Sequence, residues 1–463
     1  MPADYDDKTF EAAIDMVLGR EKHDFPQIIG GLKIASGTDR PLCSPIDSTV
    51  IFGTIQEPEE GTDALAVAKA REAFASWSKM SPAERAAVIG KAASFARTAR
   101  YRLAAEVMFS TGMVREDAMQ EADRLIEVLD KAAADAASVG GKPAGVWAIV
   151  ALASSPLASA VGYAAAAIAA GNTAVIAPSG ACPLPVYTVY KFFEQAGLPA
   201  GVLNIVTDKK DEHVARLVSE DGIDGIVASG CGGAVDELMF APADDSIKFI
   251  NEVKGTNTIV VARPSNIRKA AQDVADSAFA YAGQRLYSTS KVIVLAEEEN
   301  EFVRALVEAA KDYCVGDPAE KRTKMGPLLS PEQEKRYLDF KAENEANLLF
   351  GGKKVSGEYL ENGRYWTPMI FTGIDSSSDA LYEDQAIPAI CIIPASGIDD
   401  AVEMLSEMDS GLSIGVISAD DKVISKVKKA AAPGQTVFVN QSSRSLKPAI
   451  DAFAENFLVR GRN

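Results

Sequence analysis

The chain has 463 residues, of which 47% are hydrophobic and 24% charged, and its formal net charge is −18 at pH 7. This size and composition are typical of a globular protein with two or more domains. The acidic balance argues against nucleic acid and anionic membranes as partners, because a polyanion gains nothing from such a surface. Small molecules or proteins are expected instead. Five widely spaced cysteines and only two histidines indicate a reducing compartment and no structural metal.

The first part of the chain predicts helices that cover a sheet. Residues 1–7 are acidic and lack the basic and apolar segments of a signal peptide, so a cytoplasmic location is expected. The spacing of apolar residues predicts amphipathic helices at 64–77 and 82–104, and a longer helix at 115–137. We expect these helices to form a covering layer.

Residues 143–190 contain no charged side chain, and the stretch is long enough for a membrane helix. Its internal pattern argues otherwise. A short β-prone run at 145–152 precedes the breaker Ser154-Ser155-Pro156, and an alanine-rich segment at 157–170 ends at Gly171-Asn172. A second β-prone run follows at 173–177. The pattern predicts a β-α-β unit with a buried helix, and no membrane span.

The alternation of strands and helices continues along the chain. Nearly continuous apolar strands predict a parallel sheet covered on both faces, in a doubly wound, nucleotide-binding type of domain. A second α/β series begins after Glu252. We therefore predict one domain at 1–253, joined by the tail 437–463, and a second at 254–436. The further strands and helices behind this prediction lie at 184–196, 202–206, 225–228, 259–261, 291–295, 301–312, 347–350, 389–393 and 415–417.

The phrase Gly283-Gln284-Arg285-Leu286 resembles the signature loop of the aldehyde dehydrogenase superfamily, in which the nucleophilic cysteine follows Gly-Gln-x. The resemblance implies two doubly wound domains of that family's type, one binding NAD or NADP and one catalytic. It covers nearly the whole chain, including the phrases at 169–173, 197–204, 315–318, 326–330 and 433–440.

The resemblance also shows what has changed at the active positions. Leu286 stands where the family has its cysteine, and a leucine cannot add to an aldehyde. Glu252 falls on the glutamate that activates water. Ser154 stands where an asparagine side chain of the family donates to the oxyanion, and its side chain is shorter.

The positions implied in cofactor binding are altered as well. Ala177-Pro178-Ser179-Gly180 replaces a Lys-Pro-Ala-Glu phrase, which removes the lysine that holds the adenine ribose. Asp384 takes the place of a ribose-binding glutamate, and Ala386 that of an aromatic residue. Ala228-Ser229-Gly230-Cys231 replaces the phrase at the cofactor diphosphate, although the coenzyme A-dependent branch of the superfamily also departs there and also lacks the lysine. NAD or NADP is therefore expected to bind weakly, and no metal is expected.

Several residues allow two interpretations. Glu252 is either a general base or a glutamate kept by a hydrogen bond at the domain junction. Cys231 is either a substitute nucleophile near a helix N-terminus or a packed apolar group. Arg285 and Tyr287 either fill the tunnel next to the missing cysteine or bind a carboxylate, and core filling is favoured for Tyr287.

These changes favour a degenerate homologue with a binding, regulatory or scaffolding role. The first alternative is a nicotinamide-dependent aldehyde oxidoreductase with a non-standard site, and the second is a nucleophile-free reduction or hydrolysis that uses Glu252. The family's oligomerising flap is reduced here to residues 138–142, so we expect a monomer, or a dimer made differently from the family's usual assembly.

Overall fold

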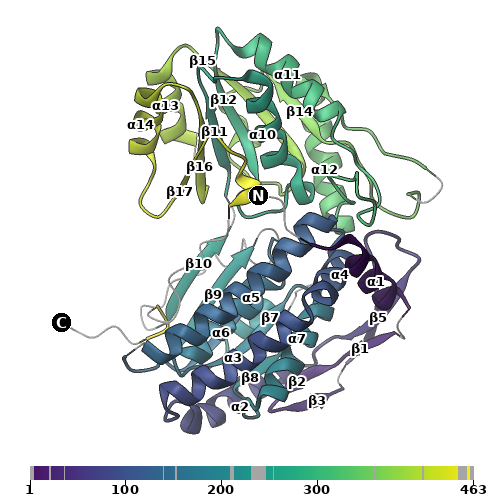
Figure 1. Cartoon of the computed structure of the whole chain (residues 1–463), viewed down its shortest axis with the longest axis vertical. Coiled ribbons are helices and arrows are strands. Elements are labelled where there is room, and N and C mark those ends of the chain that lie inside the picture. The colour runs from purple at the N-terminus through teal and green to yellow at the C-terminus, as the bar shows by residue number, and fades with distance from the viewer. Residues whose placement is uncertain are drawn as a thin grey trace.

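The computed structural model describes residues 5–19, 22–35, 37–138, 140–151, 154–208, 213–230, 247–253, 255–357, 360–408, 411–446 and 456–458. These residues form two α/β domains, each built on a seven-stranded sheet. The domains lie one above the other along the long axis of the molecule (Figure 1). The predicted fold class is confirmed.

The first sheet has the strand order β10-β9-β6-β7-β8-β2-β3. Its five strands from β10 to β8 run parallel, whereas β2 runs antiparallel to both of its neighbours. Every residue of β6 and β7 is buried, as expected for strands covered on both faces. The bounds are β2 Gln27–Ile29, β3 Leu32–Ile34, β6 Val146–Ala151, β7 Thr173–Pro178, β8 Leu203–Ile205, β9 Gly225–Gly230 and β10 Lys248–Val253.

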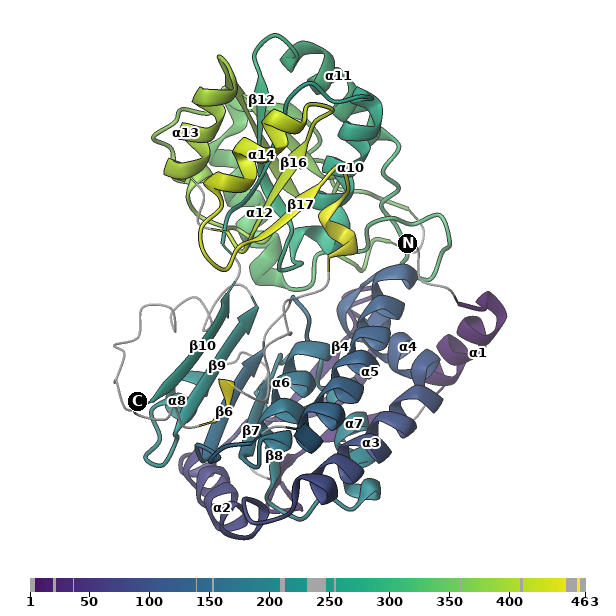
Figure 2. The ribbon, with the colours of Figure 1, turned by 60° about the vertical axis from the view of Figure 1, so that its left-hand side comes forward.

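Helices cover both faces of this sheet because successive side chains of each strand point to opposite sides. Trp147 and Ile149 of β6 pack in the cluster that contains α5, α6 and α7, while Val146 and Ala148 pack in the cluster with α2 and α8. Figure 2 shows α5 and α6 together on one side of the sheet. The bounds are α1 Asp7–Leu18, α2 Thr62–Trp77, α3 Pro82–Thr98, α4 Arg100–Thr111, α5 Arg115–Ser138, α6 Ala158–Ala169, α7 Pro183–Ala196 and α8 Val214–Val218.

The uncharged stretch forms the β6-α6-β7 unit, with every residue of α6 buried. Over the described ranges, no helix combines the length and hydrophobicity that crossing a membrane requires. The single helix predicted at 82–104 is wrong, because the chain leaves helical geometry at Ala99. Directly after this break, Arg100 Nη2 donates to Asp123 Oδ2 of α5 at 2.7 Å, a long-range contact that no local sequence pattern indicates.

The second sheet has the order β13-β14-β15-β12-β11-β16-β17 and is parallel except for β13. Its strands are β11 Asn257–Val261, β12 Thr289–Leu295, β13 Leu348–Phe350, β14 Met369–Thr372, β15 Ala389–Ala395, β16 Ser413–Ile417 and β17 Thr436–Val439. Its helices are α10 Ile267–Phe279, α11 Glu299–Lys311, α12 Pro331–Glu343, α13 Ile398–Met408 and α14 Asp421–Ala430, with short 3₁₀ turns η1 Ala280–Gly283, η2 Glu345–Asn347, η3 Asp379–Leu381 and η4 Ser443–Ser445. A smaller sheet, β1-β5-β4, contains β1 His23–Phe25, β4 Asp39–Cys43 and β5 Ile51–Gln56.

The chain passes between the two large sheets just after Glu252. β10 ends the first sheet at Val253 and β11 starts the second at Asn257. The expected return to the first domain at residue 437 falls inside β17, which stays paired with β16 in the second sheet. Residues further along do reach the first domain: Leu458 bridges Pro143, and the ring of Phe457 lies 4.3 Å from that of Trp147.

Candidate functional site

Glu252 lies on β10 directly opposite Ser229 of β9 in the parallel register. Its Oε2 accepts hydrogen bonds from Tyr163 Oη at 2.7 Å and from Ser229 Oγ at 3.0 Å, and the residue is 7% exposed. Burial raises the pKa of Glu252, and the two hydrogen bonds and the charge of Arg124 offset part of that rise. The structure therefore shows a hydrogen-bonded glutamate at the domain junction, and its role as a base stays a prediction.

Tyr163 is a site residue that the sequence analysis missed. It lies on α6, and burial raises its pKa well above the ordinary value, with a further rise from the neighbouring Glu252. Tyr287, which follows Leu286 in the chain, acts electrostatically on Tyr163 and adds to the rise in its pKa. The sequence does contain a signal for Tyr163, because it is a single tyrosine in an alanine-rich helix predicted to be buried. A buried tyrosine hydroxyl usually has a hydrogen-bond partner, so a polar partner could have been expected.

The loop that carries Leu286 has a tightly turned backbone. Tyr281 and Ala282 both have φ of 51°, and Gly283 has φ of 77°. Left-handed geometry costs a non-glycine residue about 1–3 kcal/mol. Gly283 is required here, because a Cβ would lie 2.1 Å from the carbonyl oxygen of Ile387. Such geometry is common where a fold positions a functional loop.

Leu286 itself is 2% exposed, and its carbonyl oxygen accepts a hydrogen bond from Asn257 Nδ2 at 2.9 Å. Tyr287 is buried beside it, in agreement with core filling. Arg285 turns away toward α5, where its Nη1 donates to Asp117 Oδ1 at 2.9 Å. The carboxylate that Arg285 binds is therefore one of the protein's own.

Ser154, predicted as an oxyanion donor, is buried, and its sequence neighbour Ser155 contacts a carboxylate that the sequence analysis missed. Glu121 of α5 accepts from Ser155 Oγ at 2.9 Å and from the backbone amides of Leu157 and Ala158 at 3.0 and 2.9 Å. Burial raises the pKa of Glu121, and these hydrogen bonds lower it in part. Glu121 thus occupies the N-terminus of α6. Glu121 could have been noticed in the sequence as an acidic residue on the apolar face of an amphipathic helix.

The predicted cofactor residues divide between the two domains. Ser179 follows β7, while Ser229 and Gly230 end β9, so these three lie at the carboxyl edge of the first sheet on either side of β6. Asp384 belongs to the second domain, where its Oδ1 accepts from the amide of Ala386 at 3.3 Å. Cys231 lies outside the described residues.

The carboxyl edge of the first sheet fits a dinucleotide only in part. Ligands of open α/β sheets bind at this edge, and Gly230, with φ of 126°, has a backbone that permits close approach. Ala177, at the position of the family's lysine, packs in an apolar cluster. Among the described residues that directly follow β6, β7, β8 and β9, none is basic. These described residues thus include no cation for the ribose or for a 2′-phosphate, whereas Lys209 and Lys210, which follow Asp208 in the sequence, lie outside the described residues.

The two buried cysteines among the described residues, Cys182 and Cys391, are poor substitutes for the missing thiol. Burial raises the pKa of Cys182 well above its ordinary value and that of Cys391 to about 12, so neither forms a thiolate near neutral pH. Within the described ranges, no three acidic, histidine or cysteine side chains gather as a metal would need.

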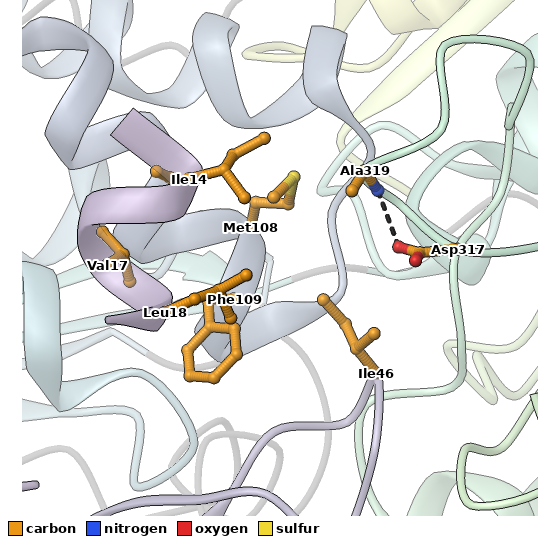
Figure 3. A pocket seen from close by; sticks show the side chains of 9 residues that line it. Ile14, Val17, Leu18, Ile46, Met108, Phe109, Asp317 and Ala319 are labelled. Carbon is orange, nitrogen blue, oxygen red and sulfur yellow. Dashed lines mark hydrogen bonds between the residues drawn. The ribbon is translucent and has the colours of Figure 1, made fainter. Parts of the chain in front are cut away.

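A small cavity of about 90 Å³ lies between α1, α4 and residues 317–319, and none of the predicted site residues lines it (Figure 3). Its lining is apolar apart from Asp317, whose Oδ1 accepts from the amide of Ala319 at 2.8 Å. This lining offers little for catalysis.

Two largely parallel α/β domains, with the buried, hydrogen-bonded Glu252 just before the chain passes from one to the other, define a two-domain protein of the doubly wound α/β class. The chain belongs to the aldehyde dehydrogenase family, whose model matches residues 34–452. This confirms the family expected from the sequence.

The chain is similar to named dehydrogenases. The 1-pyrroline-5-carboxylate dehydrogenase of Geobacillus sp. (strain WCH70) is 26% identical, over 93% of this chain and 88% of the relative. The alpha-ketoglutaric semialdehyde dehydrogenase of Bacillus subtilis is 28% identical, over 86% of each.

Solved structures share the fold. The 1-pyrroline-5-carboxylate dehydrogenase from Thermus with bound NAD has a TM-score of 0.88 at 22% identity, over 96% of this chain and 90% of that one. Proline utilization A from Bdellovibrio bacteriovorus has a TM-score of 0.86 at 25% identity over 94% of this chain, which spans 47% of that longer protein.

Proposed function

We propose that this protein is a nicotinamide-dependent oxidoreductase that acts on aldehydes at a site without a thiol nucleophile. The family and the dehydrogenase names of its relatives support an oxidoreductase rather than a degenerate homologue. The hydrogen-bonded set of Glu252, Tyr163 and Ser229 is the observation that carries the proposal.

The missing thiol determines the form of the substrate. Hydride leaves an aldehyde carbon only after a nucleophile has added to it, which is a thiolate in a covalent mechanism and water in a direct one. Since Leu286 cannot add, water must be the nucleophile, and the reacting species is the aldehyde hydrate, RCH(OH)₂. Loss of hydride from its carbon and of one hydroxyl proton gives RCOOH. A bound nicotinamide supplies the hydride acceptor.

In this proposal Glu252 takes the proton. Tyr163 and Ser229 both donate to its Oε2, which fixes the orientation of the carboxylate. Burial raises its pKa and makes it a stronger base once ionised. Activity is therefore expected to rise as the pH rises through the pKa of Glu252.

Aldehydes that differ in hydration test this proposal. Rates of nicotinamide reduction should follow the hydrated fraction, with glyoxylate well above benzaldehyde. Glu252→Gln should lower the rate by about 10²-fold or more, and Tyr163→Phe by less, whereas Tyr190→Phe on α7 is the control. A rate that does not depend on the hydrated fraction of the aldehyde would contradict the proposal. So would an unchanged rate in Glu252→Gln.

A second candidate is a binding or regulatory protein without turnover. It is favoured by the burial of Leu286 at the position of the nucleophile. Calorimetric binding of an aldehyde or an acid, with no reduction of either nicotinamide under any of these conditions, would select this candidate.

A further inference from the structure

The loop that carries Leu286 needs external support, because Tyr281 and Ala282 are two consecutive non-glycine residues in left-handed geometry. Such geometry persists only where surrounding contacts hold it. One support comes from within the second domain. Gln333 of α12, which is buried, donates through Nε2 to the carbonyl oxygens of Ala282 at 3.2 Å and Ala386 at 2.7 Å. This contact fixes the beginning of the loop.

The second support comes from the first domain and from the C-terminal segment. Arg285 Nη1 donates to Asp117 Oδ1 of α5 at 2.9 Å, and its Nη2 donates to the carbonyl oxygen of Arg444 at 2.7 Å. Arg444 Nε donates to the same Asp117 oxygen at 3.0 Å. The side chain of Asp117 is 1% exposed, against 20% for Arg285 and 13% for Arg444. Two cations therefore converge on one buried carboxylate.

The position of this cluster links it to the candidate site. Ser288 donates its amide hydrogen to the carbonyl oxygen of Arg285 at 2.9 Å, which closes a turn that contains Leu286 and Tyr287. Anchoring Arg285 therefore anchors the turn that carries Leu286 and Tyr287, and Tyr287 interacts electrostatically with Tyr163, the hydrogen-bond donor to Glu252.

We infer that Asp117 is a positioning residue that holds the Leu286 loop in place through Arg285 and Arg444, so that the site is complete only when α5, the loop and the C-terminal segment are together. Asp117 hydrogen-bonds to these arginines and acts on the reaction through them. We call the contacts of Asp117 with Arg285 and Arg444 the clamp. The effect of the clamp on catalysis rests on the proposed function, whereas its effect on the order of the loop does not.

Removing the carboxylate should loosen the loop selectively. Without Asp117, Arg444 keeps its ion pair with Glu116 at 3.2 Å, but Arg285 loses the carboxylate that its Nη1 contacts, and the two guanidinium groups remain close together and largely buried. In hydrogen exchange followed by mass spectrometry, Asp117→Asn should speed exchange about tenfold or more in peptides covering 281–290 and 442–446. Asp130→Asn is the matched control, since Asp130 lies on the same helix but pairs with Arg97 on the surface.

Two further variants keep the test valid if Asp117→Asn folds poorly. Asp117→Asn combined with Arg285→Gln removes one uncompensated cation, and it should fold while keeping the loop loose. Asp117→Glu keeps the charge and should restore slower exchange in part. Loop exchange equal to wild type in both Asp117→Asn and the double variant would overturn the inference.

The outcome is separable from that of the proposed function. If the protein shows no turnover but Asp117→Asn still speeds hydrogen exchange in the loop, the proposed function is rejected and the inferred clamp is supported. Where turnover exists, Asp117→Asn should lower kcat about tenfold or more while Asp130→Asn leaves it unchanged, and the pH dependence set by Glu252 should stay in place.

Discussion

Ser229 and Glu252 face each other across two adjacent parallel strands, and the serine hydroxyl donates to the glutamate carboxylate at 3.0 Å. The register of β9 and β10 thus sets the position of the carboxylate at the carboxyl edge of the first sheet. A shift of one residue would turn Glu252 to the other face. The candidate site therefore depends on strand pairing as much as on the identity of its side chains.

The raised pKa of Glu252 predicts a specific pH dependence of stability. Below the ordinary carboxyl pKa of about 4.3, both the folded and the unfolded protein hold this proton. As the pH rises from there through the folded pKa, the unfolded state releases the proton first, so ionisation of Glu252 disfavours folding. The free energy of unfolding of wild type, relative to Glu252→Gln, should fall across this interval in urea titrations. A constant or rising difference would contradict the assigned direction.

Glu121 should matter for stability more than its place on a helix indicates. Glu121→Ala removes the acceptor for Ser155 and for the amides of Leu157 and Ala158. Buried donors without partners cost about 1–3 kcal/mol each, so we expect a loss of about 3 kcal/mol or more in urea unfolding. Glu121→Gln keeps one acceptor oxygen and should cost less. Asp130→Ala, half-exposed on the same helix, should stay within about 0.5 kcal/mol, and an equally small effect of Glu121→Ala would reject this role.

Leu286→Cys alone should not restore the family's chemistry. The new thiol would be buried, which raises its pKa, and the neighbouring guanidinium of Arg285 already faces Asp117. Ser154 is also a poorer oxyanion donor than asparagine, and losing one such donor costs about 10²–10³ in rate. With benzaldehyde, which is poorly hydrated, the initial rate of this variant should stay near that of wild type and should rise when Ser154→Asn is added. Robust turnover by the single variant would show that the rest of the site is intact.

Nicotinamide dinucleotides should bind weakly. Ala177 lies in an apolar cluster, and the described residues that directly follow β6, β7, β8 and β9 include no cation. Each lost charge-assisted hydrogen bond is worth about 1.5–3 kcal/mol, or roughly tenfold or more in Kd. Calorimetry should therefore give dissociation constants well above the low micromolar range for both NAD and NADP. A low-micromolar constant for either nucleotide would refute this expectation.

The sequence alone determined the family, the two α/β domains and most strand positions. Continuous apolar runs predict strands buried on both faces, and the alanine-rich segment between two such runs predicts the buried helix α6. These features could be predicted because the periodicity that produces them is local. The same holds for Leu286 and Glu252, which a short motif locates along the chain.

Only the tertiary structure showed which groups act together. Tyr163 meets Glu252 across 89 positions of sequence, and Asp117 meets Arg285 across 168 and Arg444 across 327. Single charged or hydroxyl side chains give no periodic signal, and the partner of each is fixed by helix packing and sheet register. For the same reason the break at Ala99 and the capping of α6 by Glu121 could not be read from local residues. Hydrophobic periodicity is a local property of the sequence, whereas the pairing of buried polar groups depends on how distant segments pack.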